Sequence, residues 1–204
     1  MTKRTSAYFL AAAVVLGSWA PVAALAADPM DTCVGCHAKD GISTDTKVPT
    51  IAGMSVKYLT STLGDYQKKT RPCPEATVLS GPQKGNKTDM CKVTTDLSAA
   101  DIDKVAKSYS AMKYAHATQT FDAALAAKGK AIHDKLCEKC HTESGTVPDD
   151  DAGFLGGEMI GYLTAQMDDY KAAKRPMPLK MQPKIDEVQP GDIPALVNYY
   201  ASVK

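Results

Sequence analysis

The sequence predicts an all-α protein made of two tandem domains related by duplication. One short motif, C-x-x-C-H, occurs twice, at residues 33–37 and 137–141. Downstream of each copy the apolar residues recur at helical spacing, and no alternating apolar run of convincing length appears. The segments around the two motifs also match one another, which indicates an internal repeat. We therefore expect a first domain at 27–112, a linker at 113–120 and a second domain at 121–204.

The first 26 residues have the features of a secretory signal peptide. Lys3 and Arg4 form a short positive segment, an apolar stretch follows from about Tyr8 to Ala20, and residues 24–26 fit an A-x-A cleavage site. The apolar stretch is shorter than the roughly 20 residues that cross a bilayer. An uncleaved N-terminal anchor is the alternative. We expect a cleaved, periplasmic protein without a membrane span.

Cleavage changes the charge balance very little. Removing Lys3 and Arg4 from the 24 basic residues leaves 22, against 23 acidic residues. Such a balance provides no electrostatic footprint for nucleic acid, so we expect no nucleic-acid partner.

Four of the six cysteines belong to the two motifs, which have the spacing of c-type haem attachment sites. In such sites the two thiols bond to one edge of the porphyrin, and the adjacent histidine binds the iron as its proximal ligand. A thioredoxin-like pair needs neither the histidine nor a second copy, and a zinc site is a further alternative. We predict two covalently bound haem c groups. The residues concerned are Cys33, Cys36 and His37 in the first half and Cys137, Cys140 and His141 in the second.

The repeat has two registers. Up to Pro72 the halves match at an offset of 104 residues, and from Met90 onward they match at an offset of 91, so the first half carries 13 additional residues. A duplication is the simplest explanation. The matched pairs include Gly53 with Gly157, Tyr58 with Tyr162, Tyr66 with Tyr170, Arg71 with Arg175, Met90 with Met181, Ile102 with Ile193 and Tyr109 with Tyr200.

Each iron needs a second axial ligand or stays open. Met90 is the methionine that can serve the first iron from a loop, whereas Met54 begins the intervening helical segment. In the second half Met177 and Met181 are both available. We assign Met181, because it is the repeat partner of Met90 while Met177 aligns with Cys73. A histidine–methionine pair raises the iron potential relative to two nitrogens and closes both faces of the haem.

Other methionines and histidines are expected to have structural or surface roles. Met159 and Met167 lie on a helical stripe, which favours core positions. His116 and His133 could convert a site to bis-histidine ligation, but we expect both to face solvent.

The helices are placed by apolar spacing and caps. We expect helices over residues 54–68 and 121–136 and a short helix leading into the first motif. Ser98 and Asp101 resemble a capping box, and the helix that they open has its counterpart near the C-terminus, with Pro194 tolerated in the first turn. Because such small domains bury little apolar surface, the haem would supply the missing core.

A proximal histidine usually donates its second ring N–H to an acceptor that fixes its orientation. For His37 the carbonyl of Pro49 could accept, and Gly153 is the counterpart of Pro49 in the second half, where we also expect a backbone carbonyl to serve. Arg71 and Arg175 occupy equivalent positions before a proline. Since arginine forks suit carboxylates, we expect both to contact haem propionates, with exposed arginines as the alternative.

Cys73 and Cys91 bracket the 13 additional residues. In an oxidising compartment we expect them to form a disulfide, and closing a loop of this size contributes roughly 3 kcal/mol in the chain-entropy model. Since Cys91 follows Met90, the bridge would also hold the ligand loop near its iron. A metal site or a reactive thiol pair is the alternative.

Two C-x-x-C-H domains, each followed by a methionine and by a terminal helix that opens near Asp-Ile, resemble the two-domain diheme cytochromes of the cytochrome c4 type. From Phe121 through residues 137–141 to Arg175-Pro176-Met177 and Met181, the second half more narrowly resembles the haem subunit of flavocytochrome c sulfide dehydrogenase. The resemblance implies two class I cytochrome c folds related by pseudo-twofold symmetry, with propionate edges facing across the interface. It also implies a separate FAD-containing sulfide dehydrogenase subunit as a redox partner. The 13 additional residues depart from that subunit's pattern, on the surface where a flavin partner would dock.

Three functions are compatible with these features. The first is an electron-transfer subunit that accepts electrons from a flavoprotein sulfide dehydrogenase; the flavin would belong to the partner, because the chain has no G-x-G-x-x-G fingerprint. The second is an independent cytochrome c4-type shuttle to a terminal oxidase. The third is a diheme enzyme, such as a peroxidase or a thiosulfate-oxidising cytochrome, which needs an accessible iron and is disfavoured by two methionine ligands. We expect an electron-transfer protein without catalytic residues of its own.

Overall fold

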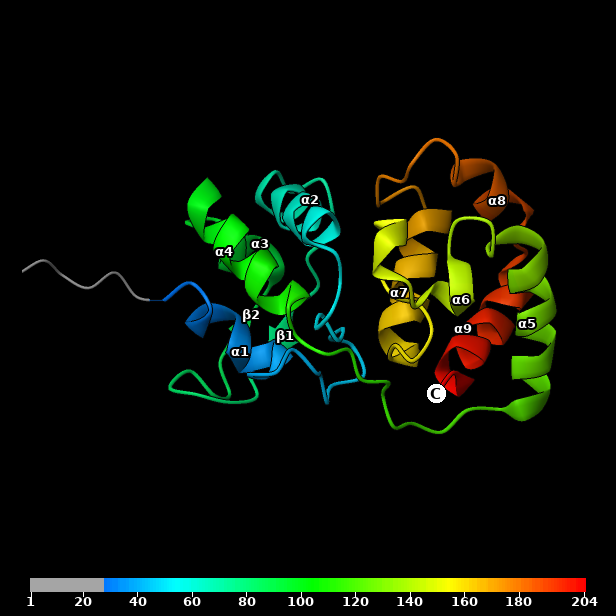
Figure 1. Ribbon diagram of the computed structural model, residues 1–204, viewed down its shortest axis with the longest axis horizontal. Coiled ribbons are helices and arrows are strands. Elements are labelled where there is room, and N and C mark those ends of the chain that lie inside the picture. Colours follow the sequence, from blue (N-terminus) through cyan, green and yellow to red (C-terminus); the bar gives the residue numbers. More distant parts are fainter. Residues whose placement is uncertain (1–27) are drawn as a thin grey trace, which may run out of the picture.

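The computed structural model describes residues 28–204, which form two groups of helices joined by an extended linker (Figure 1). The signal peptide predicted for residues 1–26 lies outside the described residues. Within residues 28–204 no helix is both long and apolar enough to span a membrane. The regular elements of the described chain are helices apart from one short hairpin, which is the all-α fold class that the sequence predicts.

The first group consists of short helices and one small hairpin. α1 is the predicted short helix of the first motif, and α2 packs against α3 and α4. Ser55 caps α2 by accepting a hydrogen bond from the amide of Tyr58, and Ser98 with Asp101 forms the predicted capping box of α4. The elements are α1 (Asp31–His37), α2 (Val56–Gln67), β1 (Ala76–Thr77), β2 (Lys87–Thr88), α3 (Met90–Thr94) and α4 (Ala99–Ser110).

The second group is built around α5 and α9, which lie side by side (Figure 1). Gly129 permits this close approach, because a Cβ atom there would lie 2.0 Å from the carbonyl oxygen of Ala195. Pro194 occupies the first turn of α9, as predicted, where its missing N–H costs no helical hydrogen bond. The elements are α5 (Ala123–Leu136), α6 (Thr142–Gly145), η1 (Pro148–Asp150), α7 (Ile160–Lys171), α8 (Gln182–Glu187), η2 (Pro190–Asp192) and α9 (Ile193–Ser202).

Each group has its own apolar core, and each core includes one residue from outside the group. The first core joins α2 to α4 and contains the buried Phe154 of the second group. The ring of Phe154 contacts the ring of Tyr114 in a tilted arrangement, with the ring centroids 4.4 Å apart. The second core joins α7 to α9 and contains Ala117 of the linker. Burying a phenylalanine contributes roughly 1.5–3 kcal/mol to stability. These shared core residues therefore stabilise the packing of the two groups and the linker.

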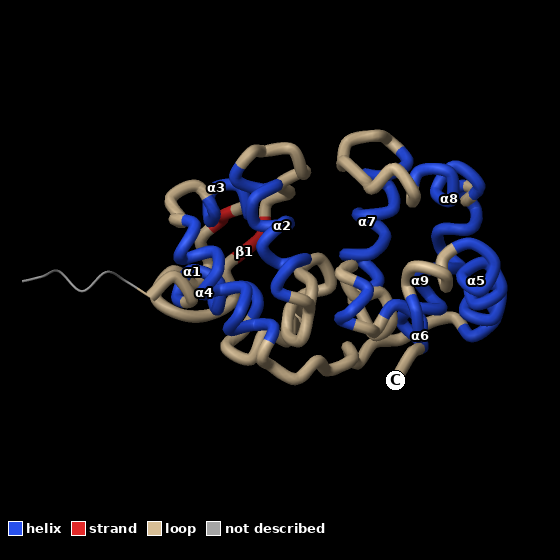
Figure 2. The backbone as a smooth tube through the Cα atoms, turned by 45° about the horizontal axis from the view of Figure 1, so that its top comes forward, coloured by secondary structure: helices blue, strands red, loops and turns tan. Residues whose placement is uncertain are grey.

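The 13 additional residues form a hairpin that covers part of the first motif. β1 pairs with β2 in antiparallel fashion (Figure 2). The amides of Leu79 and Ser80 both donate to the carbonyl of Gly35, at 2.8 and 3.1 Å. A Cβ atom at Gly35 would lie 2.8 Å from the Val78 side chain, so glycine lets the hairpin lie directly on the motif. The sequence did not predict this hairpin, because strands of two residues are too short for an alternating pattern.

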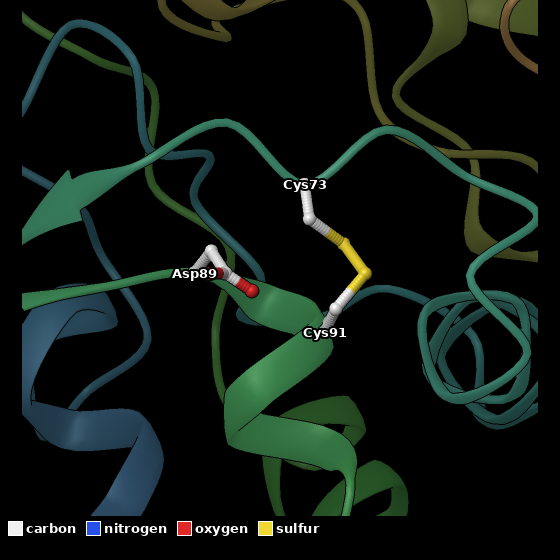
Figure 3. A group of neighbouring side chains, drawn as sticks. All are labelled: Cys73, Asp89 and Cys91. Carbon is white, nitrogen blue, oxygen red and sulfur yellow. A yellow bond between two sulfur atoms is a disulfide. The ribbon is translucent and has the colours of Figure 1, made fainter.

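A disulfide joins Cys73 to Cys91 beside the hairpin (Figure 3). Their Cα atoms are 5.8 Å apart. Cys91 lies in the first turn of α3, and Asp89 caps this helix by accepting a bond from the amide of Lys92 at 2.9 Å. The bridge is the pairing predicted from the sequence, and it leaves neither sulfur free to serve as a metal ligand or reactive thiol.

Candidate haem sites

The first motif lies on α1, with His37 as the last residue of the helix. His37 is 7% exposed, and its Nδ1 atom lies 3.0 Å from the carbonyl oxygen of Pro49, which is the contact expected from the sequence. This contact orients the ring and leaves Nε2 as the nitrogen that can bind iron. Burial lowers the pKa of His37 and the bond to Pro49 offsets this in part, so the neutral imidazole that a metal requires is favoured.

The second motif starts at the end of α5, where Cys137 caps the helix. Among the described residues, the buried Nδ1 atom of His141 has no hydrogen-bond partner. The prediction that a carbonyl near Gly153 would serve it is therefore wrong. Gly153 instead packs against the first group, since a Cβ atom there would lie 2.5 Å from the hydroxyl of Tyr58. The two motif histidines thus have different surroundings.

A cavity of about 470 Å³ lies beside the second motif. Its volume is within the range of roughly 300–1,000 Å³ that is usual for ligand and cofactor sites. Cys137, Cys140, His141 and Met181 all line it, together with apolar side chains of α7, α8 and α9. Met177 is not among the lining residues. The fold thus brings the predicted residues of the second site around one space and favours Met181 over Met177.

In the first half, Met90 is the first residue of α3 rather than a loop residue, so the expectation of a loop is wrong. The cause is Asp89, which caps the helix immediately before it. Met90 packs half-buried against the core that contains Cys33 and Met54, and Met54 is 2% exposed. Both candidate methionines therefore lie near the first motif, and the repeat with Met181 is what favours Met90.

The two other histidines differ from expectation. His133 is fully buried between α5 and α9, so the prediction that it faces solvent is wrong. Its Nδ1 atom lies 3.0 Å from the Tyr200 hydroxyl, and its Nε2 atom contacts the carboxylate of Glu138. His116 is half-buried, with Nδ1 3.0 Å from the carbonyl oxygen of Val203. Because both nitrogens of His133 are engaged, this side chain is not available to an iron.

Arg71 and Arg175 converge on one acceptor at the boundary between the two groups. Arg71 is 4% exposed, and its Nη2 atom donates to the Tyr162 hydroxyl at 2.9 Å and to Oε1 of Gln166 at 2.6 Å. Nη1 of Arg175 donates to the same Gln166 oxygen at 2.7 Å. Each guanidinium also lies over a tyrosine ring of its own half, 4.8 and 4.4 Å from the ring centroid. The alternative of an exposed arginine is therefore wrong for Arg71.

These residues fit a covalently bound haem with ionised propionates. In the described chain the four motif cysteines are not in disulfides, and Nε of buried Arg71 has no partner. Two guanidinium groups that share one neutral amide leave positive charge at the boundary, which suits a carboxylate. Burial favours the neutral phenol of Tyr58, but Arg71 and Arg175 outweigh burial and lower its pKa to about 8.

Sequence reasoning missed Glu158, a fully buried carboxyl at the same boundary. Burial raises its pKa to about 8, although the amides of Met159 and Thr50 lower it in part. At the offset of 104 residues its counterpart is the buried Met54. An acid at a position where the repeat has a core methionine was the signal that could have identified it.

Comparisons with solved structures find the same two-part architecture. Cytochrome c4 from Acidithiobacillus ferrooxidans matches with a TM-score of 0.67 at 23% identity, over 85% of this chain and 99% of that chain. Reduced recombinant cytochrome c4 from Pseudomonas stutzeri matches with a TM-score of 0.69 at 25% identity, over 87% of this chain and 97% of that chain.

Thiosulfate dehydrogenase (TsdBA) from Marichromatium purpuratum matches with a TM-score of 0.64 at 23% identity, over 83% of this chain but only 36% of that chain. No family model and no curated protein matches the sequence. The structural matches span nearly the whole length of both cytochromes c4 and include both halves of this chain. The protein therefore has the two-domain, all-α cytochrome c fold of the cytochromes c4.

Proposed function

We propose that the mature protein is a periplasmic electron carrier with two covalently bound haem c groups. Cys33 and Cys36 would hold the first haem and Cys137 and Cys140 the second. His37 and His141 would be the proximal ligands. Met90 and Met181 would complete the two coordination spheres.

The observation that carries this proposal is the cavity of the second group. It gathers both thiols, the histidine and the repeat-matched methionine of one motif around a space of cofactor size. The repeat extends the same roles to the first group. A histidine and a methionine ligand would together close both faces of each iron, which would favour electron transfer over substrate binding at the metal.

The propionates would face the boundary between the groups, where Arg71 and Arg175 meet. Support comes from the Nε atom of Arg71, which has no hydrogen-bond partner in the described part of the chain, and from the position of Arg175 in the cavity wall. Such an arrangement would bring both haems to one boundary and permit electrons to pass between them.

Two partner roles follow, and a cytochrome c4-type shuttle to a terminal oxidase is the better supported. The matches to the two cytochromes c4 span 97–99% of those chains, which supports a carrier of the same two-domain kind. The second role is a subunit that accepts electrons from a dehydrogenase. The flavoprotein sulfide dehydrogenase implied by the resemblance is one such partner, and the match within thiosulfate dehydrogenase is the observation that favours a complex of this kind.

Haem content tests the proposal directly. The exported protein, produced in a host that attaches haem c, should gain the mass of two haems and show two haems per chain in a pyridine haemochrome assay. The variant Cys137→Ser/Cys140→Ser should retain one. A colourless protein, or a wild type with fewer than two haems after complete maturation, would overturn the proposal.

Purification from the native source separates the two partner roles. A stoichiometric FAD-containing subunit, with haem reduction that depends on sulfide, would establish the dehydrogenase role. An isolated diheme protein that an oxidase re-oxidises would establish the shuttle.

A further inference from the structure

A buried carboxyl of the second group reaches the proximal histidine of the first through a single peptide unit. Oε2 of Glu158 accepts hydrogen bonds from the amides of Thr50 and Met159, each at 3.3 Å. The Thr50 amide shares its peptide bond with the Pro49 carbonyl, which lies 3.0 Å from Nδ1 of His37. Because the peptide is planar and conjugated, two hydrogen bonds on its opposite sides connect Glu158 with His37.

This carboxyl is fully buried. Glu158 is 0% exposed, and among the described residues its Oε1 atom has no hydrogen-bond partner. Burial disfavours the charged form and raises the pKa to about 8, with the Met159 and Thr50 amides acting in the opposite direction. Glu158 therefore gains or loses its charge slightly above neutral pH.

The titratable groups around it are engaged elsewhere. The linker brings Tyr114 and His116 against this loop; the Tyr114 hydroxyl donates to the carbonyl of Gly156 at 2.7 Å, and His116 pairs with a backbone carbonyl of the C-terminal segment. Burial first, and then the charge of Glu158, raise the pKa of Tyr114, so its phenol stays neutral. Gln119 of the linker donates to the backbone carbonyl of Glu158 and not to its carboxyl. From the first group, the N–H of the peptide between Pro49 and Thr50 faces the carboxyl of Glu158.

Ionisation of Glu158 acts on His37 in one direction. A carboxylate attracts the Thr50 N–H more strongly than a carboxylic acid does and makes the Pro49 carbonyl oxygen more negative. The bond from His37 Nδ1–H to that oxygen then strengthens, and the ring becomes a more basic ligand. A more basic ligand and a nearby negative charge both favour ferric over ferrous iron, so the potential falls. In the second site Nδ1 of His141 has no equivalent partner among residues 28–204.

We propose that Glu158 is a positioning residue that makes the potential of the first haem depend on pH, through the Pro49–Thr50 peptide. The proposal rests on the proposed function, because it requires a haem bound at His37. If a one-electron donor supplied an electron to a haem bound at His37, Glu158 would take up one proton from hydronium or a buffer acid, so that one O–H bond forms on Glu158 as the donor's bond to that proton breaks. On oxidation the electron passes to the acceptor and that proton returns to solvent.

Redox titration of the diheme protein against pH tests this coupling. The potential of the first haem should fall as pH rises through the pKa of Glu158, by up to about 59 mV for each tenfold change in proton concentration. Glu158→Gln should abolish this slope and give a higher first potential than the wild type at alkaline pH. The second potential should not change. Paramagnetically shifted haem resonances distinguish the two centres.

Asp151→Asn is the matched control for the loss of one carboxylate at the boundary. Asp151 bonds Lys57 and Ser55 on the surface, and these bonds lower its pKa, so the variant should keep the wild-type slope. Glu158→Met, which copies the repeat-equivalent Met54, is the second variant. In the reduced wild type, the Nδ1–H proton resonance of His37 should move with pH through the same midpoint and stay fixed in Glu158→Gln.

Infrared difference spectra of the wild type do not depend on any variant folding. Near pH 8, reduction should produce the carbonyl band of a newly protonated, buried carboxylic acid. A protein that binds two haems but shows the same first-haem slope with and without Glu158, or no such band, would overturn this inference and leave the proposed function intact. A protein that binds no haem at His37 would contradict the proposed function instead, and its haem content identifies this case.

Discussion

Met177 and Met181 lie four residues apart, yet only Met181 lines the cavity of the second motif. We expect Met181→Ala to remove about half of the methionine–iron charge-transfer absorption of the ferric protein and to lower one of the two potentials, because methionine sulfur stabilises ferrous iron. Met177→Ala is the matched control and should change neither. Visible spectroscopy with redox titration provides the measurement. If Met177→Ala causes the loss and Met181→Ala does not, the ligand assignment is reversed.

Glu158 should also make folding stability depend on pH. Its folded pKa of about 8 lies above its ordinary value of 4.5, because burial penalises the charge. Between these values the unfolded chain has released the proton and the folded chain has not. The contribution of Glu158 to the free energy of unfolding is therefore complete below pH 4.5. Between pH 4.5 and the folded pKa it declines by about 1.4 kcal/mol per pH unit.

Denaturant unfolding of the oxidised protein at several pH values between 4.5 and about 8 measures this decline. Glu158→Gln should reduce the loss of unfolding free energy over this range, since an amide does not ionise. An identical pH profile for the two proteins would show that Glu158 does not titrate in this range.

At the scale of single residues, the sequence predicted contacts that depend on local spacing. The bond between His37 and Pro49 spans only twelve residues and follows from the length of one loop. The surroundings of His133 and Arg71 were not predicted, because each is decided by an element distant in sequence. α9 buries His133, and α7 of the other group supplies the hydrogen bonds of Arg71.

The hairpin and its disulfide are the largest difference between the two halves. We expect Cys73→Ser/Cys91→Ser to lower the free energy of unfolding by about 3 kcal/mol, because the open chain regains the entropy of an 18-residue separation. The control Gln83→Ser/Lys84→Ser changes two exposed residues of the same hairpin and should have little effect. Urea unfolding of the oxidised wild type and of both double variants measures their free energies of unfolding. Equal stability of the two double variants would contradict a stabilising role for the bridge.

At the scale of elements, the sequence predicted the longer helices but not their exact ends, and it did not predict the short helices α3, α6 and α8. The capping box of Ser98 and Asp101 was predicted correctly. Met90 was expected in a loop because its helix has only five residues, too few for a periodic pattern, and depends on the Asp89 cap. The placement of Phe154 in the first core was not predicted, because it follows from the docking of the two groups.

Contacts between the two groups differ widely in their surroundings. Lys57 and Asp151 form an ion pair at 2.7 Å on the surface, where such pairs contribute little. The bond from Arg71 to Tyr162 is buried, and so is the bond from Thr50 to Glu158, while the bond from Arg71 to Gln166 is partly buried. Buried hydrogen bonds with a charged donor are stronger, and an unpaired partner is costly. Coupling of the two groups therefore depends mainly on the buried contacts.

Arg71→Ala should weaken this coupling, because it removes one buried and one partly buried bond between the groups and leaves the Tyr162 hydroxyl without its donor. We expect a loss of about 2–4 kcal/mol in unfolding free energy. Calorimetry of the diheme protein should show the single unfolding transition broaden or split as the groups separate. Arg175→Ala is the matched control at the repeat-equivalent position. Arg175 bonds Gln166 of its own group, so its loss leaves the bonds from Arg71 in place and should preserve a single transition. The same broadening in both variants would mean that the shared positive charge, rather than the bridge made by Arg71, couples the two halves.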